Sequence, residues 1–174
     1  MDGSQRLNAL EVALKNEMNE REFYLSHAAR TSNPVGKAMF NQIADDELEH
    51  YQRLKDLHEK WEKKKTWPET VPLTVKQTNV KTLLQSLIQK AYDMPVTDTD
   101  DLNAIDVATK FEAKGAELYA ELSEASANPR EKAFFKLLSG IEREHFLSLK
   151  DTEEYLKDPA SWFTRKERHG LDGA

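Results

Sequence analysis

The sequence predicts an all-α fold, a four-helix bundle of two repeated helical hairpins with a long crossover that contains a short helix. Its composition favours helices, because its 174 residues include only 6 glycines and 6 prolines and are rich in Glu, Lys, Leu and Ala. Apolar residues recur every three or four positions along four stretches, as in helices with one buried face. The second half of the chain also repeats the first at an offset of 95 residues. We expect one domain over residues 1–174.

The composition excludes several classes of function. Because the chain contains no cysteine, it cannot carry a disulfide framework, a thiolate zinc site, a cysteine-ligated iron–sulfur centre or a cysteine nucleophile. Its net charge of −6 argues against a general nucleic-acid binder, which needs a basic face. No apolar run approaches the ~20 residues of a membrane span, and residues 1–10 show no secretory leader. We therefore expect a cytoplasmic protein that binds neither nucleic acid nor membranes.

The first hairpin is expected over residues 4–64. Its helices are predicted at 4–31 and 35–64, with a break at Asn33-Pro34 because a residue before proline leaves the α region. The positions expected to face the interior are Leu7, Leu10, Leu14, Glu17, Tyr24 and Ala28 in the first helix, and Phe40, Ile43, Glu47, His50, Leu54 and Leu57 in the second. The second series has the spacing of a bundle seam, yet two of its six positions are ionisable.

The second hairpin is expected over residues 101–157. Its helices are predicted at 101–125 and 130–157, with a break at Asn128-Pro129. The inward positions are Ile105, Ala108, Glu112, Tyr119 and Leu122, followed by Phe135, Leu138, Glu142, His145 and Leu149. The C-terminal tail, residues 158–174, is expected to pack back on the bundle.

The crossover between the hairpins is expected over residues 65–100. It is rich in loop signals, but Asn79 could cap a short amphipathic helix. The apolar residues of that helix would be Leu83, Leu84, Leu87 and Ile88.

The two hairpins are copies of one another. Between residues 7–56 and 102–151, twenty of fifty positions are identical without a gap. The matched pairs include Glu17 with Glu112, Tyr24 with Tyr119, Glu47 with Glu142, and His50 with His145. Two copies of this length do not make a solenoid, so they indicate two hairpins that face each other about an approximate two-fold axis.

Each hairpin carries a Glu on its first helix and a Glu-x-x-His sequence on its second. Residues three apart lie on one helix face, so the Glu and His of each motif point the same way. Glu17 precedes Asn33 by sixteen residues and Glu47 follows it by fourteen, which places both roughly 21–24 Å from the turn. The six candidate metal ligands that meet at mid-bundle are Glu17, Glu47, His50, Glu112, Glu142 and His145.

Four carboxylates cannot all stay ionised in a protein interior unless cations compensate them. Two divalent cations would supply four positive charges, and neutral imidazoles would complete the ligand sets. Carboxylate and imidazole ligands suit iron or manganese better than magnesium or structural zinc. The alternative is a surface charge pattern duplicated with the repeat, which would have to lie on the apolar stripe.

Three further residues are candidates for a role at the centre. Tyr24 and Tyr119 lie two turns after Glu17 and Glu112 on the same face, where they could donate hydrogen bonds to ligating carboxylates. Core tyrosines with other partners are the alternative. Glu20 lies one turn after Glu17 and could be an extra ligand, although a solvated carboxylate is the commoner role for such a residue.

These motifs resemble the rubrerythrin-like branch of the ferritin-like superfamily of di-iron carboxylate proteins. The resemblance rests on Glu17 with Glu22-Phe23-Tyr24, Glu47-Leu48-Glu49-His50, Glu112 with Glu117-Leu118-Tyr119, and Glu142-Arg143-Glu144-His145. It implies two iron ions, with manganese or a mixed pair as alternatives. It also implies that Glu47 and Glu142 bridge the metals, that Glu17 and Glu112 are terminal ligands, and that each His binds one metal.

The sequence departs from that family in two respects. Rubrerythrins carry a rubredoxin-type domain with four cysteines, whereas this chain has none, so its electrons must come from a separate donor protein or small molecule. The family also carries an additional Glu one turn after the third-helix ligand. This chain has Gly115 there, and Glu20 is the pseudo-symmetric counterpart of that position.

The leading hypothesis is a non-haem di-iron oxidoreductase that reduces hydrogen peroxide or dioxygen. Two ferrous ions would each give one electron, while the protein supplies ligands, a dry cavity and proton donors. The alternatives are a ferroxidase or iron-handling protein, and a binding module that senses iron or oxygen. A homodimer is expected, because a long crossover between similar hairpins allows two subunits to exchange them.

Overall fold

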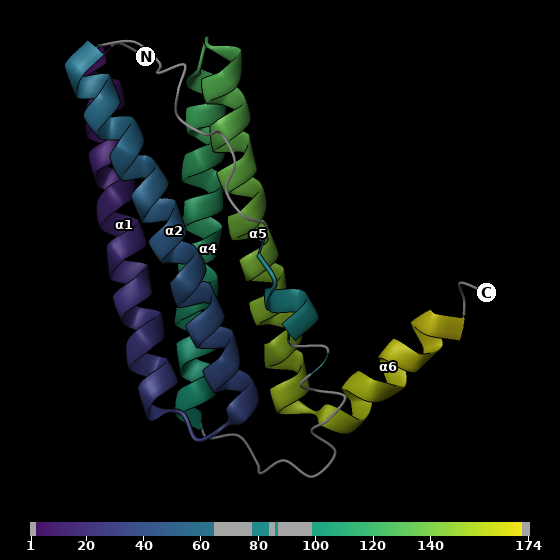
Figure 1. The fold of residues 1–174 in the computed structure, drawn as a ribbon. Coiled ribbons are helices and arrows are strands. Elements are labelled where there is room, and N and C mark those ends of the chain that lie inside the picture. Colours follow the sequence, from purple (N-terminus) through teal and green to yellow (C-terminus); the bar gives the residue numbers. More distant parts are fainter. Residues whose placement is uncertain (1–2, 65–77, 84–85, 87–98, 172–174) are drawn as a thin grey trace.

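The computed structural model describes residues 3–64, 78–83, 86 and 99–171, and every regular element within those residues is a helix. This confirms the all-α prediction. The elements are α1 (Gly3–Arg30), α2 (Pro34–Lys64), α4 (Thr99–Ala125), α5 (Pro129–Lys157) and α6 (Pro159–Leu171). Figure 1 shows the first four running side by side as two antiparallel hairpins, α1–α2 and α4–α5. No helix in the described ranges is long and apolar enough to cross a membrane.

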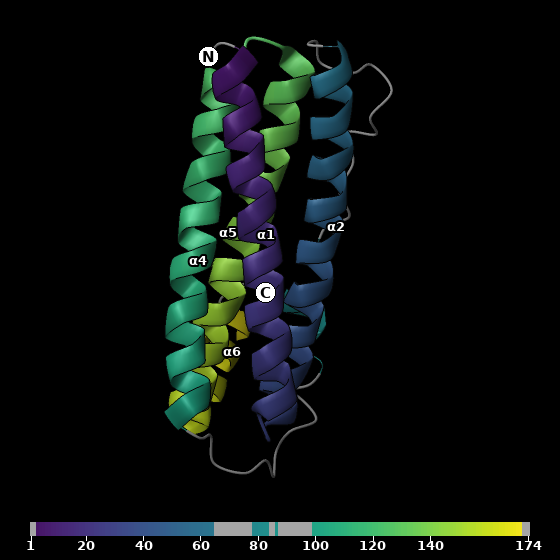
Figure 2. The same cartoon turned by 90° about the vertical axis from the view of Figure 1, so that its left-hand side faces the viewer.

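The two hairpins pack against each other through equivalent helices. Figure 2 shows α1 flanked by α2 and α4, with α5 behind it. Helix α1 contacts α4, and α2 contacts α5. Any group on the inward face of one helix can therefore meet groups from the other three.

Both hairpin turns use the same capping chemistry. The side-chain oxygen of Asn33 accepts hydrogen bonds from the backbone N–H groups two and three residues later, at 2.9 and 3.1 Å. Asn128 does the same in the second hairpin, at 2.9 and 3.4 Å. Pro34 and Pro129 begin the following helices, where a missing N–H costs nothing. The Asn-Pro pairs therefore stop one helix and start the next at matched heights.

The bundle core consists of two apolar clusters with ionisable residues between them. One cluster surrounds Tyr24, Phe40 and Ile105, and the other surrounds Leu54, Tyr119 and Phe135. All eleven inward positions predicted for the second and fourth bundle helices are buried, which confirms the helical phase. They are Phe40, Ile43, Glu47, His50, Leu54, Leu57, Phe135, Leu138, Glu142, His145 and Leu149.

Part of the crossover lies against the bundle. Residues 80–83 are helical, and the backbone N–H of Leu83 donates to the carbonyl of Asn79 at 2.9 Å, as expected for a helix that begins after Asn79. Val80 is fully buried in the cluster that contains Tyr24 and Phe40. Three residues of the predicted amphipathic helix lie outside the described residues: Leu84, Leu87 and Ile88.

The C-terminal tail differs from the expectation, because it forms α6 and the axis of that helix points away from the bundle (Figure 1). Asp158 starts the new helix by accepting a hydrogen bond from the backbone N–H of Ser161 at 3.0 Å. Only the first turns pack back: Trp162 is 6% exposed, its ring meets Tyr155 edge-on, and its indole N–H donates to Asp151 at 3.0 Å.

Candidate metal centre

Six ionisable side chains from the four bundle helices meet between the two apolar clusters. Each is at most 2% exposed. They are Glu17 from α1, Glu47 and His50 from α2, Glu112 from α4, and Glu142 and His145 from α5. The structure thus brings together all six residues that the sequence singles out as metal ligands.

The six residues form two overlapping groups. We call Glu17, Glu47, His50 and Glu142 the His50 cluster, and Glu47, Glu112, Glu142 and His145 the His145 cluster. Within each cluster, one ligand-type atom from every residue lies within 4.8 Å of the others. Glu47 and Glu142 belong to both, so each cluster has two carboxylates that it shares and one that it does not.

Both imidazoles turn Nδ1 towards the carboxylates. Nδ1 of His50 lies 3.0 Å from Oε2 of Glu47 and 3.2 Å from Oε1 of Glu142. Nδ1 of His145 lies 3.3 Å from Oε1 of Glu47 and 3.7 Å from Oε2 of Glu142. Each shared carboxylate therefore directs one oxygen to each cluster.

The unshared carboxylates complete the two clusters in equivalent ways. Oε2 of Glu17 lies 3.2 Å from Nδ1 of His50, and Oε2 of Glu112 lies 3.3 Å from Nδ1 of His145. The two imidazole rings stack with their centroids 6.0 Å apart. The approximate two-fold relation seen in the sequence thus extends to individual ligand atoms.

The charge balance of the site explains why cations would bind there. Burial, above all, raises the pKa of Glu17 and Glu112 well above the ordinary range. Burial acts in the same direction on Glu47 and Glu142, but attraction to neighbouring imidazoles outweighs it, so the pKa of each is lowered. Without metal the site must hold protons to remain stable, and divalent cations could replace those protons.

Several inward-facing oxygen and nitrogen atoms of the centre lack hydrogen-bond partners within the described part of the chain, which suits them to bind a metal. Oε1 of Glu47, Oε2 of Glu112, both oxygens of Glu142 and Nδ1 of His145 make no well-directed hydrogen bond to any described residue. Buried polar atoms are normally hydrogen-bonded, so such a concentration needs an explanation. Carboxylate oxygens and imidazole nitrogens facing one another form a donor set suited to iron or manganese.

Two tyrosines hold the unshared carboxylates from the opposite hairpin. The hydroxyl of Tyr24 on α1 donates to Oε1 of Glu112 on α4, and the hydroxyl of Tyr119 on α4 donates to Oε1 of Glu17 on α1. Burial raises the pKa of both phenols well above the usual value, so they remain protonated donors. Each bond occupies the outer oxygen and leaves Oε2 turned towards a cluster.

Glu20 lies beside the centre but belongs to neither cluster. It is 9% exposed, so the expectation of a solvated carboxylate is wrong. Burial, followed by repulsion from carboxylates such as Glu47 and Glu112, raises its pKa to about 11. Its counterpart in the repeat, Gly115, lies against Glu142, and a Cβ at that glycine would come 3.4 Å from Cγ of Glu142. The second hairpin therefore has close packing where the first has a carboxyl group.

Sequence reasoning missed one group of residues at the centre. Oδ2 of Asp46 lies 3.1 Å from Nε2 of His145, and Oδ1 of Asp46 accepts a hydrogen bond from Gln42 at 3.0 Å. Burial acts to raise the pKa of Asp46, but hydrogen bonds with His145 and with Thr78 of the crossover outweigh it, and the pKa is lowered. The available signal was a mismatch in the repeat, because the residue that corresponds to Asp46 is Ile141.

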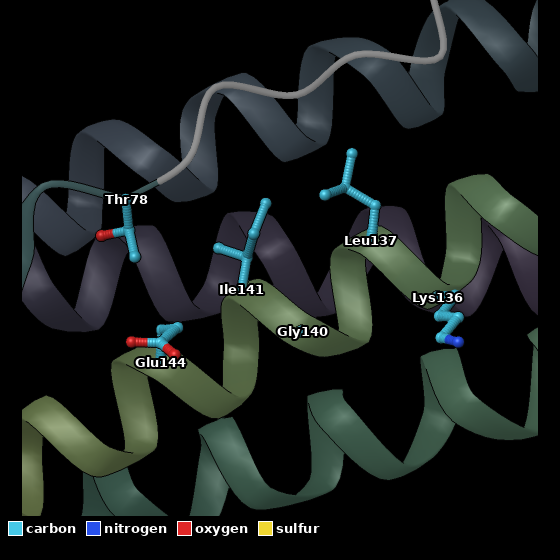
Figure 3. Close-up of a pocket in the computed structure, with 6 residues that line it drawn as sticks. All are labelled: Thr78, Lys136, Leu137, Gly140, Ile141 and Glu144. Atoms are coloured by element: carbon cyan, nitrogen blue, oxygen red, sulfur yellow. The ribbon is translucent and has the colours of Figure 1, made fainter.

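A pocket of about 440 Å³ lies between α5 and the crossover (Figure 3). Its lining residues are Thr78, Lys136, Leu137, Gly140, Ile141 and Glu144. Leu137 and Ile141 point towards the side on which Thr78 lies. None of the six candidate ligands lines this pocket, so it is distinct from the centre, although its lining residue Ile141 directly precedes Glu142 in the sequence.

Comparison with known protein families gives one match. A family model described as Rubrerythrin matches residues 8–153, which include all but the first residue of the repeat and all six residues of the two clusters. Neither the curated proteins nor the solved structures provide a match to the chain.

Proposed function

The chain belongs to the rubrerythrin family, and from that premise we propose that it is a non-haem di-iron oxidoreductase that reduces hydrogen peroxide with electrons from an external donor. One observation carries the proposal. Glu47 and Glu142 each direct one oxygen to the His50 cluster and the other to the His145 cluster. Two adjacent cations that share two carboxylates could each give one electron to a two-electron oxidant such as hydrogen peroxide.

The proposed roles of the ligands follow from the two clusters. Glu47 and Glu142 would bridge the ions, Glu17 and Glu112 would each bind one ion, and each imidazole would bind through Nδ1. Two bound ferrous ions would supply one electron each, and these electrons with two protons convert hydrogen peroxide to two molecules of water.

The surrounding residues would keep the reaction local. The apolar clusters above and below the centre exclude water, which strengthens electrostatic interactions inside it. Tyr24 and Tyr119 would orient the unshared carboxylates and hold a proton on each hydroxyl oxygen. A bulky reductant cannot reach ligands that are at most 2% exposed, so electrons would have to cross the protein from a donor at the surface.

Rapid mixing tests the proposal. The protein is loaded anaerobically with two ferrous ions per chain and mixed with hydrogen peroxide or with dioxygen, while the absorbance of the ferric product is followed. We expect peroxide to oxidise both ions of each chain and dioxygen to react more slowly. Slow or absent oxidation by both oxidants would overturn the proposal.

A second experiment distinguishes this proposal from the main alternative, a ferroxidase or iron-handling protein. A ferroxidase would react readily with dioxygen and then release or store ferric iron. Repeated additions of ferrous iron and dioxygen, followed by light scattering, would reveal a growing mineral core. We expect no such particle, and iron that stays at two ions per chain after repeated cycles with peroxide.

A further inference from the structure

The geometry around the two histidines points to an order of metal binding. We propose that Asp46 is a positioning residue that makes the His145 cluster the tighter metal position, so that the first divalent cation binds there and the His50 cluster fills second. This inference rests on the proposed metal centre. It adds a difference in metal affinity between the two clusters, which have the same types of ligand.

His145 is prepared for metal binding by the residues behind it. Its Nδ1 faces the carboxylates, so a bound metal requires the remaining ring proton to be on Nε2. Oδ2 of Asp46 lies 3.1 Å from Nε2 and accepts that proton in a hydrogen bond. A carboxylate in this position fixes the tautomer and the ring orientation, and it raises the basicity of the ligating nitrogen.

Asp46 is itself held in place from two directions. The amide of Gln42, one turn earlier on α2, donates to Oδ1 at 3.0 Å. Thr78 adds a hydrogen bond from the crossover. The acceptor for His145 is therefore part of a network that ties α2, α5 and the crossover together.

His50 has no such support. Its Nδ1 faces the carboxylates as in His145, but its Nε2 is buried and has no hydrogen-bond partner among the described residues. In the repeat, the position of Asp46 corresponds to Ile141, which is 4% exposed, and Gln42 corresponds to Leu137. Metal binding through Nδ1 of His50 would therefore leave a buried N–H group without an acceptor, which is unfavourable.

The size of the difference can be estimated from outer partners of metal-binding histidines. Loss of such a partner typically weakens metal binding by about 10- to 100-fold. We therefore expect the His145 cluster to bind a divalent cation about 10- to 100-fold more tightly than the His50 cluster.

The unshared carboxylates allow each position to be measured alone. E17Q removes a ligand only from the His50 cluster, and E112Q removes one only from the His145 cluster. Anaerobic titration with Co²⁺, followed by its visible absorption, gives a dissociation constant for the remaining position in each variant. We expect E17Q to bind Co²⁺ about 10- to 100-fold more tightly than E112Q. Glu20 is present in both variants, so the comparison between them does not test its contribution.

Substitution of Asp46 then tests the cause. D46I gives α2 the residue that α5 has at the matching position. We expect D46I to weaken Co²⁺ binding about 10- to 100-fold in the E17Q background and to leave it unchanged in the E112Q background. D46N keeps the size of the side chain and one acceptor oxygen, so it should give a smaller loss in the same background. Circular dichroism shows whether D46I folds, and D46N replaces it in the test if it does not.

The outcomes separate this inference from the proposed function. Equal Co²⁺ affinities of E17Q and E112Q, or an equal loss in both backgrounds on substitution of Asp46, would overturn the inference and leave the di-metal centre intact. Ordered binding in a wild-type protein that does not react with peroxide would overturn only the proposed reaction. Absence of Co²⁺ binding by the wild-type chain would overturn both.

Discussion

The two hairpins of this protein are alike where they form the centre and different just outside it. Helices α1 and α2 contribute Glu17, Glu47 and His50, and α4 and α5 contribute the same residue types at positions 112, 142 and 145. One step further out the copies diverge. The first hairpin has Asp46 and Glu20, and the second has Ile141 and Gly115 in the same places.

This difference shows which residues can differ between the two halves of a duplicated bundle while the ligands stay the same. A change of any shared ligand alters both clusters at once, because Glu47 and Glu142 each direct oxygens to two groups of residues. A change behind a ligand affects one cluster only. The outer residues are therefore where two equivalent metal positions can become unequal while the ligand set stays the same.

The largest effect is expected when a shared carboxylate is removed, compared with removal of an unshared one. E142A should abolish metal binding at both clusters, because its side chain serves both, whereas E17Q and E112Q should each leave one position. After loading with ferrous iron and removal of free metal, elemental analysis should find no iron on E142A and one ion per chain on either control variant. Retention of one ion by E142A would contradict the bridging role.

A smaller effect is expected when either tyrosine hydroxyl is removed. These hydroxyls extend the comparison of the hairpins, because each donates a hydrogen bond from one hairpin to a glutamate of the other. Y24F and Y119F each leave an oxygen of a buried glutamate without its donor, which costs roughly 1–3 kcal/mol of unfolding free energy. Urea unfolding of the metal-free variants should show similar losses for the two. Y51F, a half-buried tyrosine outside the centre, is the control. A loss in only one of the pair would show that the repeat is not symmetric at this level.

The smallest effect concerns the turns. N33A should destabilise the protein by about 1–2 kcal/mol and N128A by about 0.5–1 kcal/mol, since both caps accept two backbone hydrogen bonds. Asn33 is 5% exposed, so water cannot replace its oxygen, whereas Asn128 is exposed. Chemical denaturation measures both values, and a larger loss for N128A would contradict this reasoning.

Much of the fold and of the candidate site could be predicted because it depends on local rules. The period of apolar residues predicted which faces are buried, and Asn33-Pro34 and Asn128-Pro129 predicted the turns within one or two residues. The tail was predicted less well, because Asp158-Pro159 can both end one helix and begin another. Glu20 was expected in water, since its neighbours along the chain say nothing about the carboxylates of the other helices that lie near it.

The sequence by itself determined the four bundle helices, their pairing as hairpins and the six residues that meet at mid-bundle. Those features follow from helical geometry within about thirty residues and from a repeat that doubles every signal. Tertiary structure alone decided that Tyr24 serves Glu112, and that Asp46 supports a histidine 99 residues away. Such contacts depend on how one hairpin is set against the other, and a pattern along one helix contains no information about the rotation and height of its neighbour.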